Sequence, residues 1–199
     1  MGQPELQRIL DLQAFLQKFN SIDRAILHPG STTRRETDTE HSFSLAMVAW
    51  FLASGFPELN IDKLIKFALV HDLVEIYAGD TFAYGDKSLI DSKVQREHDA
   101  LKQIEAEWPD FKEMVKTIRR YEKLDSPESK FVYALDKLMP IFMVLLGKGL
   151  TWQEKQITLD KVIESKTQKV ALSPEINSYY KKLLVLLKEN EHYFGKESS

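Results

Sequence analysis

The chain has 199 residues, of which 43% are hydrophobic and 11% aromatic, and it contains no cysteine. This length and composition indicate a single domain with a substantial hydrophobic core. The absence of cysteine excludes a disulfide framework, a zinc-thiolate site and a cysteine nucleophile. The formal net charge of −3, with basic residues dispersed among acids, favours neither nucleic acid nor a membrane surface as a partner.

The N-terminal segment carries charges throughout and lacks the apolar run of a signal peptide. The longest apolar stretch, 138–146, is far too short to span a bilayer. We therefore expect a cytoplasmic protein.

The hydrophobic pattern is helical along nearly the whole chain. A first helix is predicted from Pro4 to about residue 19, followed by a loop over 20–35 that contains Pro29-Gly30. The capping-box pattern Thr37-x-x-Glu40 begins a helix that ends before Gly55. A further helix is predicted over 60–78, and Gly79 ends it.

Five more helices are predicted, over 88–108, 109–121, 128–146, 151–167 and 173–193. No segment shows the alternation of a strand between turn signals. The expected fold class is all-α, with about eight helices in one compact array over residues 1–199.

Several charged residues interrupt apolar helices. His71 and Asp72 lie within the apolar segment 67–74, and Asp136 lies within the apolar segment 131–139. Charged side chains avoid a core unless they are paired or bind a metal. His41 lies in the first turn of its helix. Two imidazoles and two carboxylates around one divalent cation would explain these positions.

Each of these residues taken singly is more often a packing or capping residue than a ligand. The combination is more demanding, because it needs a helix-initial histidine, then a His-Asp pair, then an aspartate two or three helices later. Glu75 falls on the same helical face as His71 and Asp72. Asp80 follows Gly79, where a loop brings its carboxylate over the same region.

The series of histidine, His-Asp and aspartate resembles the HD-domain metal-dependent phosphohydrolases. Four short motifs are similar to those of the branch of bacterial 5'-deoxynucleotidases and human HD-domain-containing proteins. They are Thr39-Glu-His-Ser42, His71-Asp-Leu-Val-Glu75, Gly79-Asp80 and Ala134-Leu-Asp-Lys-Leu138. The resemblance covers about residues 5–165, which would form the core of the domain, with C-terminal helices over 151–194. It implies a homodimer, for which the apolar C-terminal helix offers a surface.

The resemblance also implies roles for individual residues. The implied metal ligands are His41, His71, Asp72 and Asp136. Glu75 and Asp80 match acids implicated in catalysis. An arginine before the first histidine binds the substrate phosphate in that branch, and Arg24, Arg34 and Arg35 are the candidates here. Ala25 stands where the branch has a tryptophan after this arginine.

The expected cofactor is one divalent transition metal ion, and imidazole with carboxylate suits Mn, Co, Fe, Ni or Zn. Only His98 lies between the His-Asp pair and Asp136, which disfavours a second metal. The expected reaction is hydrolysis of a small phosphorylated substrate, with deoxynucleoside 5'-monophosphates preferred. One cation and one arginine suit a single phosphate, and the loop 79–86 offers acids rather than further basic groups.

Two alternatives remain open at the level of the sequence. One is hydrolysis of another phosphate ester or of a nucleoside triphosphate. The other is a helical regulatory module that binds metal without catalysis. The acids Glu75 and Asp80, which a purely structural metal site would not need, favour an enzyme.

Overall fold

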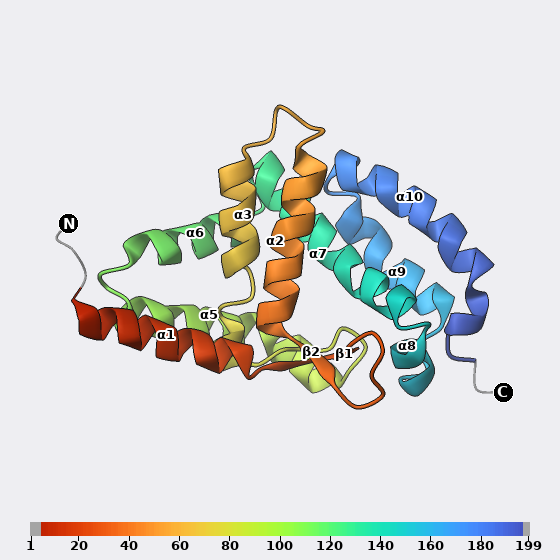
Figure 1. The fold of residues 1–199 in the computed structure, drawn as a ribbon, viewed down its shortest axis with the longest axis horizontal. Coiled ribbons are helices and arrows are strands. Elements are labelled where there is room, and N and C mark those ends of the chain that lie inside the picture. The colour runs from red at the N-terminus through yellow and green to blue at the C-terminus, as the bar shows by residue number, and fades with distance from the viewer. Residues whose placement is uncertain (1–4, 197–199) are drawn as a thin grey trace.

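Helices make up most of the computed structural model, which describes residues 5–196. The helical fold class is confirmed, and Figure 1 shows the arrangement. The predicted helix start at Pro4 lies outside the described residues. In chain order the elements are α1 (Leu6–Asn20), β1 (Asp23–Leu27), β2 (Arg35–Thr37), α2 (Asp38–Ala53), α3 (Ile61–Val70), α4 (Glu75–Ala78), α5 (Lys87–Glu107), α6 (Lys112–Glu122), α7 (Pro127–Leu146), α8 (Leu150–Glu154), α9 (Leu159–Val170), α10 (Pro174–Glu189) and a 3-10 helix (Glu191–Tyr193).

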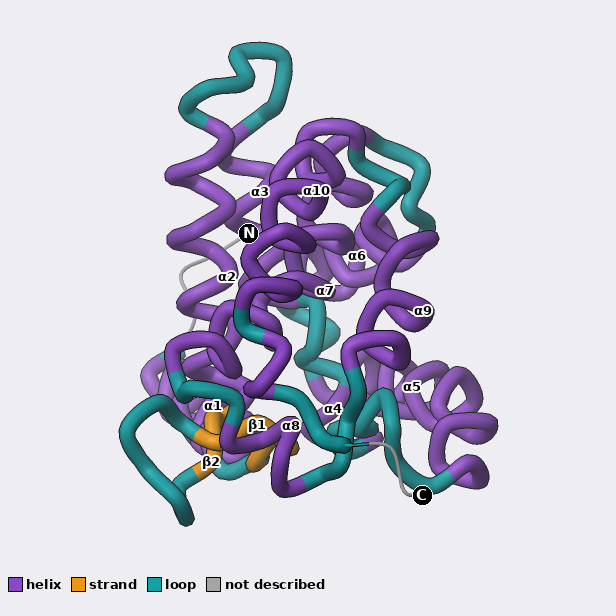
Figure 2. Tube along the Cα trace, turned by 90° about the vertical axis from the view of Figure 1, so that its right-hand side faces the viewer, coloured by secondary structure: helices purple, strands orange, loops and turns teal. Residues whose placement is uncertain are grey.

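The segment predicted to be a loop over 20–35 contains a strand of a small β-hairpin. Strand β1 pairs antiparallel with β2, with Asp23 opposite Thr37 and Leu27 opposite Arg35. A two-stranded sheet this short is marginal by itself. Tertiary contacts hold it, since the Leu27 amide donates to Thr151 Oγ1 of α8 at 3.0 Å. Figure 2 places the hairpin and α8 at the same end of the molecule.

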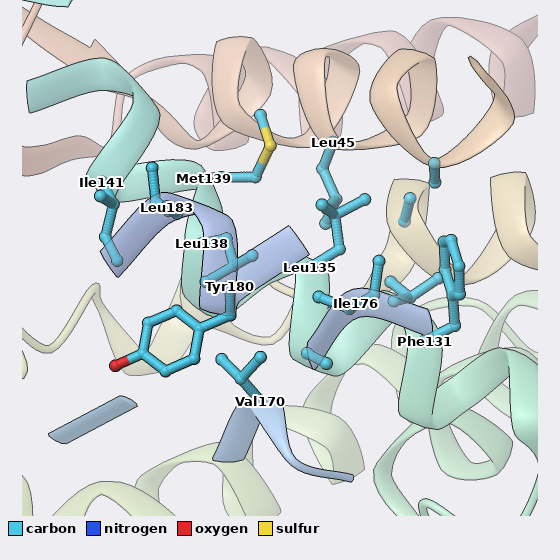
Figure 3. Packing of buried hydrophobic residues seen from close by; sticks show 14 of the residues in the cluster. Leu45, Phe131, Leu135, Leu138, Met139, Ile141, Val170, Ile176, Tyr180 and Leu183 are labelled. Atoms are coloured by element: carbon cyan, nitrogen blue, oxygen red, sulfur yellow. The ribbon is translucent and has the colours of Figure 1, made fainter. Parts of the chain in front are cut away.

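Two hydrophobic clusters form the core. The larger one joins α2, α3, α7, α9 and α10, and Figure 3 shows Leu45, Leu135, Leu138 and Tyr180 within it. The smaller cluster joins α1, α5 and α6 and includes Leu73 from the segment before α4. The chain between α3 and α4 therefore lies where the two clusters meet.

The helix predicted over 60–78 is interrupted at residues 71–74. The Ala68 carbonyl, which would accept the Asp72 amide in a continuing α-helix, accepts a hydrogen bond from His71 Nδ1 at 2.9 Å. Tight i to i+3 bonds follow, such as the Glu75 amide to the Asp72 carbonyl at 2.8 Å. The prediction of one continuous helix was wrong because a side chain competes for a backbone acceptor here.

The helix predicted over 151–167 is also divided in two. Residues 155–158 separate α8 from α9, and the Thr158 side chain caps α9 by accepting the Lys161 amide. The separation lets Trp152 of α8 stack on Phe194, with ring centroids 4.3 Å apart. Helix α9 thereby packs along α7, where its residues reach the pocket described below.

The last predicted helix, over 173–193, ends earlier in the structure, with α10 stopping at Glu189 before a 3-10 turn. Within residues 5–196, no helix is long and apolar enough to cross a membrane.

Candidate metal centre

Four side chains from distant parts of the sequence meet at the junction of the two clusters. His41 comes from α2, His71 and Asp72 from the turn after α3, and Asp136 from α7. Each offers one nitrogen or oxygen atom, and these atoms lie within 4.8 Å of one another. His41 Nε2 lies 2.9 Å from Asp136 Oδ1, and His71 Nε2 lies 2.9 Å from Asp72 Oδ2. The structure thus brings together all four residues that the sequence singled out.

The orientation of His71 suits a metal ligand. Because a carbonyl only accepts, the hydrogen bond to Ala68 places a proton on Nδ1. Nε2 points into the cluster, and a metal that displaces the proton from Nε2 would meet its lone pair there. Among residues 5–196, Nε2 of the buried His71 has no hydrogen-bond partner. A backbone carbonyl that fixes the tautomer in this way is the usual support of a metal-binding histidine.

His41 is fully buried and differs from His71 in its electrostatic surroundings. Burial, together with the charge of Arg24, lowers the pKa of His41 to about 4 despite its contact with Asp136. Burial also acts to lower the pKa of His71, but the carboxylates of Asp72 and Asp136 outweigh it and raise that pKa to about 10. His41 is therefore a neutral imidazole near pH 7, ready to donate an electron pair.

The donor set fits a divalent cation. Burial acts to raise the pKa of Asp72 and Asp136, but their cationic and imidazole neighbours hold both values well below the ordinary range. Two ionised carboxylates in a buried site need compensating positive charge. Two imidazoles and two carboxylates could hold such an ion, and this mixture of nitrogen and oxygen suits a transition metal.

Arg24 of β1 lies beside this cluster. Its Nη1 donates to Asp72 Oδ2 at 2.9 Å and to Asp38 Oδ1 at 3.0 Å, and its Nε lies 3.6 Å from Glu36 Oε2. Among the residues that the structure describes, Nη1 makes all the hydrogen bonds of this guanidinium. The hairpin therefore positions an arginine whose Nη2 stays free for a ligand.

Glu75 and Asp80 lie in the same pocket as Arg24. Glu75 is buried, and its Oε1 accepts a hydrogen bond from Lys93 Nζ at 3.2 Å. No described residue forms a hydrogen bond with its Oε2. Burial, followed by the charge of Asp72, raises the pKa of Glu75 well above its ordinary value, and burial also raises that of Asp80. Burial therefore disfavours the ionised form of both acids in this site.

The pocket has a volume of about 340 Å³ and opens to solvent beside the metal centre. Aromatic and basic side chains line it as well as the acids. The aromatic group consists of Phe82, Tyr84, Tyr133 and Trp152, and the basic group consists of Arg24, Lys93, Lys137, Lys166 and Lys169. The pocket therefore offers rings for stacking on one part and positive charge for an anion on another.

The other two candidate arginines lie outside this pocket. Arg34 is half exposed and pairs with Glu40. Arg35 pairs with Glu154, with Nη2 at 2.8 Å from Oε1, and also bonds the Ala25 carbonyl. The structure thus brings only Arg24 of the three to the acids of the site.

Sequence reasoning missed several residues of the site. Asp38 and Glu36 are buried beside Arg24, but neither was singled out from the sequence. The run of alternating acids at 36, 38 and 40 was the available signal. Lys166 and Lys169 gave no signal, because lysines three residues apart on an amphipathic helix ordinarily face solvent.

The chain is similar to several known proteins. The HD domain family matches residues 16–177. Human 5'-deoxynucleotidase HDDC2 is 35% identical over 106 residues, which cover 52% of this chain and 50% of that protein. The mouse protein of the same name is 36% identical over 104 residues, covering 51% of each chain. The chain thus spans about half the length of the curated relatives it matches.

Solved structures show the same fold over most of the chain. A crystal structure described as a predicted metal-dependent phosphohydrolase from Magnetospirillum magnetotacticum MS-1 has a TM-score of 0.78 and 28% identity, covering 95% of this chain and 96% of that one. A protein from Pyrococcus horikoshii OT3 has a TM-score of 0.64 and 21% identity, covering 91% and 99%. The second likeness concerns the fold alone.

Proposed function

The chain belongs to the HD-domain family, and from this premise we propose that it is a metal-dependent phosphohydrolase that acts on nucleoside 5'-monophosphates, with deoxynucleotides preferred. One observation carries the proposal. Four donor atoms of His41, His71, Asp72 and Asp136 converge within 4.8 Å of one another, beside a pocket that also holds an arginine with a free nitrogen.

The proposed metal ligands are these four residues, and the proposed cofactor is one divalent transition metal ion, with Mn, Co, Fe, Ni and Zn as candidates. When bound, the ion would supply Lewis-acid polarisation of the phosphoryl group and activation of water. The support is the donor set itself, together with the free Nε2 of His71.

Arg24 is the proposed phosphate-binding residue. Its Nη1 is held by Asp38 and Asp72, so its guanidinium is fixed in position before substrate binds. Nη2 then donates to a phosphate oxygen as a charge-assisted hydrogen bond. Ala25 beside it has a small side chain in the pocket wall, which leaves room for the nucleoside among the rings of Phe82 and Tyr133.

Glu75 and Asp80 are the proposed catalytic acids. Oε2 of Glu75 is free and lies in the part of the pocket next to Asp72, where it accepts a hydrogen bond from the attacking water. Asp80 is the proposed donor of a proton to the leaving oxygen of the sugar, and the rise of its pKa by burial supports this role. Lys93 keeps Glu75 in place through Oε1.

The preference for deoxynucleotides is supported by the relatives, which are named 5'-deoxynucleotidases. The test is a phosphate-release assay with dAMP, AMP and dATP, each with Mn, Co, Fe, Ni or Zn. We expect turnover of dAMP to exceed that of AMP and dATP. Rapid hydrolysis of dATP with negligible release from either monophosphate would overturn the proposed substrate class. Absence of release from every phosphate ester would instead favour a metal-binding regulatory module.

We also propose that the protein is a homodimer in the cytoplasm. The sequence places the contact surface on the C-terminal helix, and α10 does expose Val185 and Leu186. Helix α2 exposes a larger apolar stripe of Phe43, Met47 and Trp50, whose spacing puts them on one face. A contiguous exposed apolar face of this kind supports association between chains.

A further inference from the structure

Lys166 is the most unusual charged residue of the pocket. It lies on α9 and lines the pocket, yet only 6% of its surface is exposed. Lysine is almost never buried to this extent without a partner. Among residues 5–196, no acidic side chain forms an ion pair with Lys166, and no group accepts a hydrogen bond from it.

Two other lysines of the pocket differ in this respect. Lys137 pairs with Asp136, and Lys93 pairs with Glu75 and Glu97. Those two ammonium groups are therefore neutralised within the protein. Lys166 has no such partner, and although its side chain is mostly buried, its ammonium group reaches the space of the pocket. We infer that a bound ligand supplies the negative charge that pairs with Lys166.

Lys169 lies one helical turn further along α9 and also lines the pocket. It is exposed, which places it where the pocket meets solvent. Burial, followed by the positive charge of Lys137, lowers the pKa of Lys166 to about 8 and lowers that of Lys169. The two ammonium groups therefore share a region of positive potential that an anion would relieve.

We propose that Lys166 and Lys169 form a second anion-binding subsite, which receives the second phosphate group of a doubly phosphorylated nucleotide bound in the same pocket. The proposal rests on the proposed function, because it assumes that the first phosphate lies at Arg24 and the metal centre. Lysine binds phosphate as a compact point charge, and a multiply charged anion can engage two ammonium groups at once.

This inference extends the expectation drawn from the sequence. The loop 79–86 offers acids and no basic group to a second phosphate, and the sequence therefore favoured a single one. The fold instead brings in basic groups from α9, which lies far later in the chain. The further phosphate is either the β-phosphate of a nucleoside diphosphate or a 3'-phosphate on the sugar, and both present the same chemistry to the lysines.

Calorimetric titration of the metal-free protein in EDTA tests the proposal without any turnover. The probes are dAMP, dADP and 2'-deoxyadenosine 3',5'-bisphosphate, at one ionic strength. We expect at least one doubly phosphorylated probe to bind about tenfold more tightly than dAMP, as one additional charge-assisted contact would give. The probe that gains identifies which of the two phosphates occupies the subsite.

The double variant Lys166→Met/Lys169→Met should lose this gain while its affinity for dAMP changes by less than about threefold. The matched control is Lys161→Met, on the exposed face of the same helix, which should behave as the unchanged protein. A third readout is thermal unfolding of Lys166→Met without ligand. Replacing this unpaired and largely buried lysine by an apolar chain of similar shape should raise Tm by about 2–4 °C.

An equal loss of affinity for all three probes in the double variant would overturn the proposal, because it would assign the lysines to the first phosphate. Retention of the gain in the double variant would overturn it as well. Failure of the proposed function has a different signature, namely no phosphate release from any monophosphate in the metal-supplemented assay. The difference in affinity between dAMP and the doubly phosphorylated probes is measured without turnover. The two failures can therefore be told apart.

Discussion

At the scale of single residues, the site depends on side chains that are buried but not satisfied by the protein alone. His71 is the clearest case, because one ring nitrogen is committed to the Ala68 carbonyl and the other faces two carboxylates. Arg24 is likewise held on one side and free on the other. Buried polar groups that lack some of their hydrogen-bond partners are expected where a ligand supplies the missing partners.

Asp72→Ala should abolish metal binding while the protein stays helical. The change removes a direct ligand, but the two hydrophobic clusters do not depend on this side chain. Elemental analysis after metal reloading should give about one ion per chain for the unchanged protein and none for the variant. Asp62→Ala, on the exposed start of α3, should retain the metal. Global unfolding of the Asp72 variant, seen as loss of helical circular dichroism, would indicate a structural metal instead.

Glu75→Gln should keep the metal and lose most turnover. The amide preserves the shape of the buried side chain, and the four-residue ligand set is complete without Glu75. Loss of a side chain that positions the attacking water and takes part in proton transfer typically reduces kcat by about 10²–10⁴. Steady-state kinetics and metal content should be measured on the same sample. If the variant loses its metal as Asp72→Ala does, Glu75 is a ligand rather than a catalytic group.

Arg24→Ala should weaken substrate binding by about 10–100-fold in KM, the range expected for loss of a hydrogen bond between charged groups. Arg34→Ala and Arg35→Ala are matched controls, because their side chains pair with Glu40 and Glu154 away from the pocket. Both controls should leave KM within about twofold. A large effect of either control, with none from Arg24→Ala, would show that another arginine binds the phosphate.

At the scale of elements, short interruptions of the helices decide where the site residues lie. The turn at 71–74 lets His71, Asp72 and Glu75 all reach the region between the clusters. The break between α8 and α9 lets α8 support β1 through Thr151, while α9 turns its lysines toward the pocket. The hairpin that carries Arg24 therefore depends on α8.

A substitution at Gly149, next to the start of α8, tests how much the fold depends on this helix. Gly149 has φ at +81°, in the left-handed region, and a Cβ there would lie 2.6 Å from the Tyr193 Cα. Gly149→Ala should destabilise the fold by about 1–3 kcal/mol, through backbone strain and this collision. Urea unfolding measures the change. Gly55→Ala, whose Cβ would meet only an ordinary contact, should shift stability by about 0.5 kcal/mol or less. Equal effects of the two changes would contradict the assigned strain.

At the scale of the whole molecule, the candidate site lies between the two hydrophobic clusters of the core. Helix α7 passes through the middle of the array and carries Asp136 (Figure 1). The outer surfaces differ, since α2 exposes a stripe of large apolar side chains and α10 exposes fewer. This asymmetry bears on the proposed homodimer.

Trp50→Asp should shift the protein from dimer to monomer if α2 forms the contact, because a carboxylate in an apolar interface is costly. Val185→Asp is the matched change on α10, the surface expected from the sequence. Sedimentation equilibrium distinguishes the two. If only Val185→Asp dissociates the dimer, the contact lies on the C-terminal helix, as expected from the sequence. If the unchanged protein is a monomer, the proposed dimer is excluded.

The sequence alone was sufficient for the helical fold class and for the four residues that converge in the candidate metal centre. Helical periodicity is a local property, and a charged residue within an apolar run is visible without a structure. His41, His71, Asp72 and Asp136 could therefore be selected before their distances were known.

Only the tertiary structure decided the rest. The hairpin exists because α8 and α7 support it, and the turn at 71–74 exists because one side chain takes a backbone acceptor. Arg24 could be distinguished from Arg34 and Arg35 only by its contacts with buried acids. The burial of Lys166 follows from the packing of α9 against α7 and is not visible in its local sequence. Burial and proximity arise from contacts between segments far apart in the chain, and no local pattern encodes them.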